Sequence, residues 1–292
     1  KRKFAEVLKK QVNHREHLFS AIPANYVTNV IERISTFSEN LGLDRLNEDY
    51  IHVSDLIRVC PREYVLSVRY SRPRRPFPKL SDRLVWAIGR AVEDVVRKQF
   101  IMGKHFQRIM GRWKCNCGRL EYDGWHRSRH KVCRVCHDRP MVYTELPLSD
   151  SDYGIVGSPD LVFFNSGKAY IVEIKSMTKT MFDDLSQPLG DHILQVMMYR
   201  YLARKNNIPL ADRSIFVYVR KEYQFSGVVK EFHHPYRDSD YEEVLQGFLR
   251  IAEEIRGSFS DRTVPVRECC SSRKCARARK CLLADICFST ES

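Results

Sequence analysis

The sequence of 292 residues contains no apolar run that approaches the length of a membrane-spanning helix. It also lacks the hydrophobic segment of a secretory signal peptide. We therefore expect a cytoplasmic protein with no membrane partner. Because 43% of the residues are hydrophobic, the chain can bury a sizeable core, as one large domain or two smaller ones.

Acidic residues are under-represented, with 36 Asp and Glu against 49 Lys and Arg, which gives a formal net charge of +13. Basic residues cluster at positions 69–75 and 273–280. This balance favours a polyanionic partner, and nucleic acid before a membrane surface. The alternative is a protein that is basic without such a partner.

Ten cysteines occur without a secretory signal, so the sequence does not indicate a secreted disulfide scaffold. The cysteines are grouped along the chain, and tight groups indicate metal binding in a reducing compartment. The first group is Cys115, Cys117, Cys133 and Cys136, the second is Cys269, Cys270, Cys275, Cys281 and Cys287, and Cys60 stands alone.

Apolar periodicity divides the chain into three expected regions: an N-terminal helical region at 1–50, a core at 51–110 and 141–292, and an insertion at 111–140 that has no apolar period. Within them the sequence predicts a hairpin at 157–176, a strand at 214–220 and helices at 24–40, 84–100, 186–206 and 241–256. Pro61 is expected to begin a further helix with Cys60 at its N-cap, where the helix dipole would favour a thiolate.

The apolar hairpin at 157–176 carries three charges that need an explanation. If its turn is symmetric about the Ser-Gly centre, Asp160 faces Glu173, and like charges directly opposite one another destabilise a sheet. Lys175 lies two residues after Glu173, so both side chains project from the same face of the strand. A divalent cation between the two carboxylates, with the ammonium beside it, would convert this repulsion into a binding site.

Polar side chains on two predicted helices could complete such a site. His192, Gln195 and Tyr199 are spaced so that they share one helical face. Glu93 could turn toward the hairpin, with Asp94 as the alternative ligand if the helix is offset by one residue. The structural alternatives are that Gln195 and Tyr199 are surface groups and that Glu93 pairs with the arginine four residues later.

Four motifs occur in this order: Gly89-x3-Glu93, Gly157-Ser-Pro-Asp160, Glu173-Ile174-Lys175 and Gln195-x3-Tyr199. Together they resemble the PD-(D/E)xK nuclease superfamily, and the Gln-x3-Tyr element resembles its RecB-like branch. The resemblance covers about residues 50–290 and implies an α/β fold of the restriction-endonuclease type, a mixed sheet flanked by helices.

The same resemblance implies that Asp160, Glu173 and the Ile174 carbonyl bind Mg²⁺ or Mn²⁺. Lys175 would then orient or activate the attacking water. Many RecB-like members have His where this chain has Glu93, and a carboxylate there shifts the expected metal preference toward Mg²⁺.

Cys60-Pro61-Arg62-Glu63-Tyr64, followed about 210 residues later by a cysteine cluster, is similar to the iron-sulfur nucleases of this branch, the CRISPR-associated exonucleases and the AddB subunit. In them one early and three late cysteines hold a [4Fe-4S] cluster. Here the late spacing departs from the C-x2-C-x5-C pattern of those proteins. We expect Cys275, Cys281 and Cys287 to be the late ligands, with Cys270 or Cys269 as alternatives, and structural zinc or free thiols as the competing interpretation.

The insertion has the spacing of a zinc ribbon, in which Cys115, Cys117, Cys133 and Cys136 form a closed tetrahedral Zn²⁺ site. Because the first pair is C-x-C, three histidines are possible substitutes: His126, His130 and His137. The surrounding basic residues could contact DNA phosphates, or the ribbon could be a docking surface. These are Arg119, Arg127, Arg129, Lys131 and Arg134.

These features predict a metal-dependent DNA nuclease, with an exonuclease acting on single-stranded or unwound DNA ends favoured over an endonuclease. DNA is the expected partner, together with a helicase, recombination or defence-complex protein. Two alternatives stay open: a partner-dependent endonuclease subunit of a mobile-element or defence complex, and a non-catalytic DNA-binding module that retains the fold.

Overall fold

A computed structural model describes most of the chain from residue 49 to residue 290. The described residues are 49–58, 60–74, 79–102, 109–123, 133, 135–137, 141–221 and 228–290. The helix predicted at 24–40 lies outside them, as do six residues proposed around the zinc ribbon. These six are His126, Arg127, Arg129, His130, Lys131 and Arg134.

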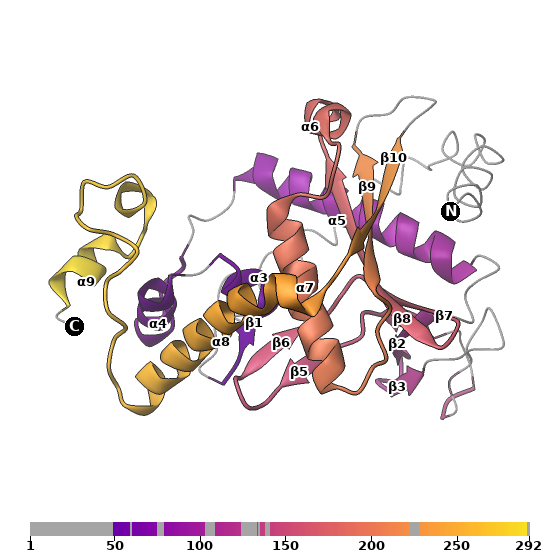
Figure 1. The fold of residues 1–292 in the computed structure, drawn as a ribbon, viewed down its shortest axis with the longest axis horizontal. Coiled ribbons are helices and arrows are strands. Elements are labelled where there is room, and N and C mark those ends of the chain that lie inside the picture. The colour runs from indigo at the N-terminus through magenta and orange to yellow at the C-terminus, as the bar shows by residue number, and fades with distance from the viewer. Residues whose placement is uncertain are drawn as a thin grey trace.

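A seven-stranded mixed sheet forms the centre of the described part of the chain (Figure 1). Its strands follow the order β10-β9-β8-β7-β2-β3, and β4 pairs with β2 beside this path. The bounds are β2 Ile109–Lys114, β3 Leu120–Asp123, β4 Val142–Thr144, β7 Leu161–Asn165, β8 Lys168–Met177, β9 Arg213–Arg220 and β10 Val229–Pro235. β8 and β9 are parallel, and the other pairs are antiparallel.

The predicted hairpin is β7–β8, and its register is the predicted one, because Leu161 pairs with Val172. Ser166 and Gly167 both have positive φ, 51° and 76°, as a two-residue hairpin turn with the twist of the flanking strands requires. The turn therefore fixes which residues of β8 lie beside Asp160, which immediately precedes β7.

Helices cover both faces of the sheet. α7 (Gly190–Lys205) lies in front of β8 and β9 in Figure 1, and α5 (Leu80–Met102) passes behind them. Successive residues of β8 point to opposite faces of the sheet. Ile171 packs in the apolar cluster that contains the buried side of α7. Val172 and Ile174 pack in the cluster on the other face, where Val96 of α5 also lies. Glu173 and Lys175 consequently project to the α7 side.

A second sheet of three strands lies beside the first among the described residues, in the order β1-β6-β5. The strands are β1 Ile51–His52, β5 Leu148–Asp150 and β6 Ile155–Gly157, and the short helix α3 (Val53–Leu56) follows β1. β5 and β6 contact α7, so this sheet supports that helix.

The helices predicted within the described residues and the predicted strand are confirmed, with small changes at their ends. The helix predicted at 84–100 is α5, the one at 186–206 is α7, the one at 241–256 is α8 (Asp238–Ser260), and the strand predicted at 214–220 is β9. The remaining helices are α4 (Pro61–Arg69), α6 (Lys179–Asp184), the 3-10 helix η2 (Ala278–Lys280) and α9 (Ala284–Ser289). As predicted, Cys60 is the N-cap of α4 and Pro61 its first residue. No helix in the described ranges is long and apolar enough to cross a membrane.

The tail after α8, residues 261–290, packs on α4 to form what we call the C-terminal lobe, at the left of Figure 1. Arg62 fixes this lobe. Its side chain is 1% exposed, and its guanidinium donates to the carbonyl oxygens of Pro265 at 2.7 Å, Cys287 at 3.1 Å and Thr290 at 2.5 Å. One buried side chain therefore joins segments more than 200 residues apart.

We expect Arg62→Met to release the tail, because three carbonyl groups would lose a charged donor in a buried setting. The free energy that holds the lobe should fall by about 2–4 kcal/mol. Limited proteolysis should then cut within 261–290 much faster than in wild type. Arg250→Met, at an exposed position of α8, is the control, and equal cleavage of both variants would contradict this role for Arg62.

Candidate functional site

Three charged side chains of the β7–β8 hairpin converge at one end of the sheet. Asp160 accepts a hydrogen bond from the backbone N–H of Ile174 at 2.7 Å, through its Oδ2 atom. The Nζ atom of Lys175 lies 2.5 Å from Glu173 Oε1 and 3.9 Å from Asp160 Oδ2. The sequence-based expectation that these side chains share one location is therefore met, with the ammonium standing between the two carboxylates.

Glu93 approaches this site from α5. It is half-buried, and burial together with the nearby Asp160 raises its pKa to about 7. Asp94 is exposed and pairs with Arg97 at 3.3 Å, so the structure favours Glu93 over Asp94 as the residue that faces the hairpin. The alternative pairing of Glu93 with Arg97 is not formed among the described residues.

Arg97 and Glu145 are also part of this site, although sequence patterns did not indicate them. Arg97 Nη2 lies 2.9 Å from Glu145 Oε1 and 3.9 Å from Asp160 Oδ1. Burial and Asp160 raise the pKa of Glu145. Glu145 follows β4, which reaches the site only because β4 pairs with β2 and β2 pairs with β7. No local spacing could have revealed this contact.

Several acidic side chains lie close together around the Lys175 ammonium, and this crowding shifts their pKa values. Glu173 is 1% exposed, and its burial, followed by the proximity of Asp160, raises its pKa to about 8. Burial alone would lower the pKa of Lys175, but Glu173 and Asp160 outweigh burial and raise it above its ordinary value. Lys175 is therefore charged at neutral pH, whereas burial and the proximity of Asp160 favour the protonated forms of Glu173 and Glu93.

This donor set fits a hard divalent cation. Carboxylate oxygens are the ligands that Mg²⁺ and Mn²⁺ prefer. The Oε2 atom of Glu173 is buried and has no hydrogen-bond partner in the described part of the chain, which is costly unless a ligand satisfies it. Asp160, Glu173 and Glu93 are the residues that could hold the ion, and the role predicted for the Ile174 carbonyl stays a prediction.

Gln195 and Tyr199 form a pair on the site side of α7. The side-chain amide of Gln195 donates to the Tyr199 hydroxyl at 2.8 Å, and both Glu173 and Asp160 contribute, after burial, to raising the pKa of Tyr199. A Cβ atom at Gly157 would lie 2.7 Å from the Tyr199 ring. The glycine that begins the Gly-Ser-Pro-Asp motif is therefore required by the tyrosine of the Gln-x3-Tyr motif.

His192 contacts a strand residue that was not anticipated. Its Nδ1 atom lies 2.9 Å from the hydroxyl of Tyr218, and the two rings stack with centroids 5.6 Å apart. Tyr218 is the cross-strand neighbour of Lys175. Burial, followed by Lys175 and Arg58, lowers the pKa of His192 to about 4, so the imidazole is neutral at physiological pH.

The four cysteines of the insertion come together at the end of β2. Cys115 Sγ lies 3.4 Å from Cys136 Sγ, and Cys117 Sγ lies 3.7 Å from Cys133 Sγ. All four sulfur atoms lie within 4.8 Å of one another. A tetrahedral ion with bonds of about 2.3 Å needs sulfur–sulfur distances of about 3.8 Å. The group could hold a metal ion, as its spacing predicted, and His137 is not a member of it.

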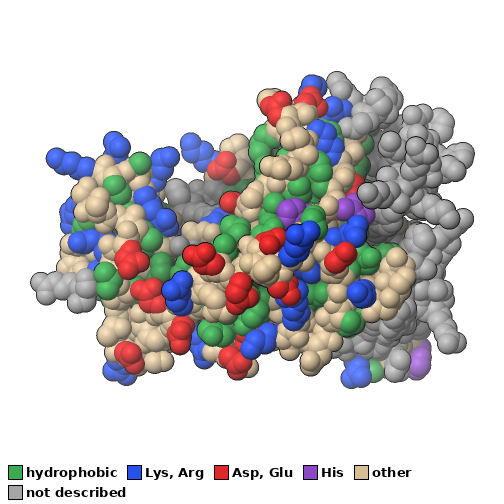
Figure 2. Space-filling model, in the orientation of Figure 1, with side chains coloured by type: hydrophobic (Ala, Val, Ile, Leu, Met, Phe, Trp, Pro, Cys, Tyr) green, Lys and Arg blue, Asp and Glu red, His purple; other side chains and the backbone are tan. Residues whose placement is uncertain are grey.

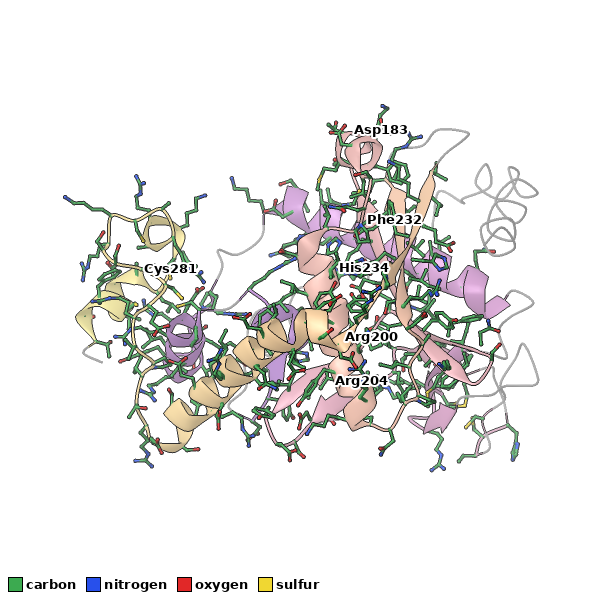
Figure 3. All side chains as sticks on the ribbon, viewed as in Figure 1. Asp183, Arg200, Arg204, Phe232, His234 and Cys281 are labelled. Atoms are coloured by element: carbon green, nitrogen blue, oxygen red, sulfur yellow. The ribbon has the colours of Figure 1, made fainter. Side chains whose placement is uncertain are left out.

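The remaining cysteines gather in the C-terminal lobe, where Figure 3 labels Cys281 close to α4. A pocket there is lined by five of them: Cys60, Cys269, Cys270, Cys281 and Cys287. Cys275, which we expected to be a ligand, does not line this pocket; its sulfur accepts from the Ala278 N–H at 3.3 Å and lies next to Cys270. The predicted meeting of the early cysteine with the late cluster is thus present, with the alternatives Cys269 and Cys270 inside the pocket.

The environment of Cys60 differs from the expectation of a helix-stabilised thiolate. Burial, followed by the neighbouring Cys269, raises its pKa to about 12. Burial thus outweighs the field of a helix of only nine residues. The buried Cys60 thiol would have to lose its proton to a cationic centre that bound there.

We expect the metal-free protein to lose stability as pH rises, because folded Glu173 and Glu93 keep their protons above the pKa of an unfolded glutamate. This contribution is complete below about pH 4.5 and is lost as pH approaches about 8. Between pH 5 and pH 9, Glu173→Gln should therefore gain on the order of 2 kcal/mol relative to wild type in urea unfolding with a chelator present. Glu253→Gln, on the exposed side of α8, should show no such gain, and parallel pH profiles for wild type and Glu173→Gln would refute the assignment.

Comparison with known proteins places the chain in a family. No curated protein matches the sequence. Among solved structures, the chain is similar to an alkaline exonuclease from Laribacter hongkongensis, with 11% identity, a TM-score of 0.45 and alignment over 76% of this chain and 95% of that one. Residues 58–287, which include every charged residue described above, match the family model of the PD-(D/E)XK nuclease superfamily. The chain belongs to this superfamily.

Proposed function

We propose that the protein is a metal-dependent deoxyribonuclease that acts as an exonuclease on the ends of single-stranded or unwound DNA. The convergence of Asp160, Glu173 and Lys175 at one end of the sheet carries this proposal. Membership of the nuclease superfamily supports it. A module that had lost catalysis would have no reason to retain a buried carboxylate whose Oε2 atom has no hydrogen-bond partner in the described part of the chain, because such an atom is costly to the fold.

The carboxylates and Lys175 have separate roles in the hydrolysis of a phosphodiester bond. A bound Mg²⁺ or Mn²⁺, held by Asp160, Glu173 and Glu93, would act as a Lewis acid at the phosphate. Lys175 orients the water whose oxygen forms the new bond to phosphorus, and its ammonium stabilises the charge that develops on the phosphate. The bond from phosphorus to the leaving sugar oxygen breaks, and that oxygen takes up a proton.

Charge supports DNA as the substrate. Lys and Arg side chains are prominent on the C-terminal lobe, at the left of Figure 2. They include Arg267, Arg273, Lys274, Arg277, Arg279 and Lys280, all exposed. Cations of this kind bind phosphates without regard to sequence. End-directed action is inferred from the resemblance of Gln195-x3-Tyr199 to the RecB-like branch.

For the two cysteine centres we propose different metals. Cys115, Cys117, Cys133 and Cys136 would hold Zn²⁺, because their spacing suits a single tetrahedral ion. Cys60, Cys281 and Cys287, with one of Cys269, Cys270 and Cys275, would hold a [4Fe-4S] cluster. A cluster of four irons stands between its thiolates, so these sulfur atoms need not approach one another as closely as those of a zinc site.

We expect Lys175→Ala to lower the rate of DNA hydrolysis in Mg²⁺ or Mn²⁺ by at least about 100-fold, because charge stabilisation and water orientation are both lost. Lys168→Ala, at the exposed start of the same strand, should stay near the wild-type rate. Linear and covalently closed single-stranded DNA should be compared. Equal activity or equal inertness of wild type and Lys175→Ala would remove the catalytic assignment, and degradation of closed circles would identify an endonuclease.

The metal assignments predict separable losses. Anaerobically purified protein should absorb visible light at about 400 nm and should contain both iron and zinc. Cys281→Ser should lose the absorbance and the iron but keep zinc, whereas Cys117→Ser should lose zinc but keep the absorbance. Zinc without iron in wild type would show that the C-terminal pocket is not an iron-sulfur site.

A further inference from the structure

A chain of hydrogen bonds connects α7 to the strand that neighbours Lys175. The backbone N–H of Leu189 donates to the Tyr218 oxygen at 3.1 Å, and that hydroxyl lies 2.9 Å from Nδ1 of His192. Tyr218 is 0% exposed, so its one hydroxyl proton needs an acceptor inside the protein. Among the described residues, Nδ1 of His192 is the acceptor that the structure offers this proton.

This arrangement determines the tautomer of His192. A neutral imidazole that accepts at Nδ1 carries its proton on Nε2. In the described part of the chain, the bond at Nδ1 is the hydrogen bond that the structure gives this ring. The side chain is part-exposed, so the Nε2–H group is a fixed donor that a ligand can reach.

The position of His192 indicates what that ligand is. Tyr218 pairs directly with Lys175 across β8 and β9, and Lys175 is close enough to contribute to the low pKa of His192. On the next turns of α7, Gln195 and Tyr199 line the same site. The Nε2–H donor of His192 thus lies beside the place where the proposed function puts the scissile phosphate. The exposed Arg58 lies on the same side and pairs with Asp191 at 3.3 Å.

We propose that His192 is a substrate-binding residue whose Nε2–H donates to a non-bridging phosphate oxygen of the DNA strand, and that Tyr218 positions it by fixing the tautomer. This inference rests on the proposed function for the identity of its ligand. The contact binds the strand and takes no part in proton transfer.

The first test needs no DNA. Nitrogen-15 NMR of the histidine side chains should show His192 protonated at Nε2 in wild type, with the signal assigned by its absence in His192→Gln. In Tyr218→Phe, Nδ1 of His192 loses the hydrogen bond that it accepts from the Tyr218 hydroxyl. The nitrogen-15 signals of His192 should then shift toward those of a mixture of tautomers. An unchanged tautomer in Tyr218→Phe, or protonation at Nδ1 in wild type, would overturn the positioning role.

The second test measures binding of a single-stranded oligonucleotide in Ca²⁺. The side-chain amide nitrogen of His192→Gln can occupy the position of Nε2. The shorter side chain of His192→Asn places its amide nitrogen only at the position of Nδ1. We expect His192→Asn to weaken binding by about 10-fold and to bind clearly less tightly than His192→Gln. In hydrolysis, His192→Asn should raise KM more than it lowers kcat. His233→Asn, at an exposed position of β10, is the control.

The outcomes separate this inference from the proposed function. Equal affinity of His192→Gln and His192→Asn, in protein whose wild type hydrolyses DNA, would overturn the role of His192 alone. Loss of binding in His192→Asn, in protein that never hydrolyses DNA, would support the phosphate contact while the catalytic assignment fails.

Discussion

The structure depends on one electrostatic constraint, which is that Lys175 must balance several buried acids at the end of β8. Its ammonium lies 2.5 Å from Glu173 and 3.9 Å from Asp160, while Glu93 and Glu145 approach from other elements. Lys175 and Arg97 are the two basic side chains among these four carboxyl groups, so burial and mutual repulsion keep some of the carboxyl groups protonated without a further cation. A divalent ion would remove this imbalance, so metal binding and folding of the site would support each other.

Packing keeps this unfavourable arrangement in place. The site residues of β8 face α7, and the residues between them are buried against the α5 side, so a shift in register by one residue would bury the charged side chains in the apolar cluster on the α5 side. The close contact of Gly157 with the Tyr199 ring joins the start of the hairpin to α7. Rigid elements therefore bring the charges together, as a site for positioned water and phosphate requires.

Local chemistry in the sequence was enough to predict the hairpin, its register and the shared face of Glu173 and Lys175, because a symmetric Ser-Gly turn and a two-residue period determine all three. The long helices followed from their apolar period. Glu145 and Tyr218 could not be predicted, because they reach the site through pairings between strands distant in sequence. The choice among late cysteines also depended on tertiary structure: a tail stapled by Arg62 puts Cys269 and Cys270, rather than Cys275, in the pocket with Cys60.

The two cysteine centres occupy positions where the main sheet offers little support. The Cys115–Cys136 group stands at the end of β2, past the residues that pair with β7, where the chain has few apolar residues to bury. The C-terminal lobe stands apart from the sheet and carries exposed cations that repel one another (Figure 2). Cys115 and Cys133 add to the apolar cluster that contains Trp113, and in both places a bound metal would supply cohesion beyond that of the few apolar residues. Because neither set of cysteines belongs to the carboxylate site, these centres can stabilise the fold without competing for the ion that the carboxylates require.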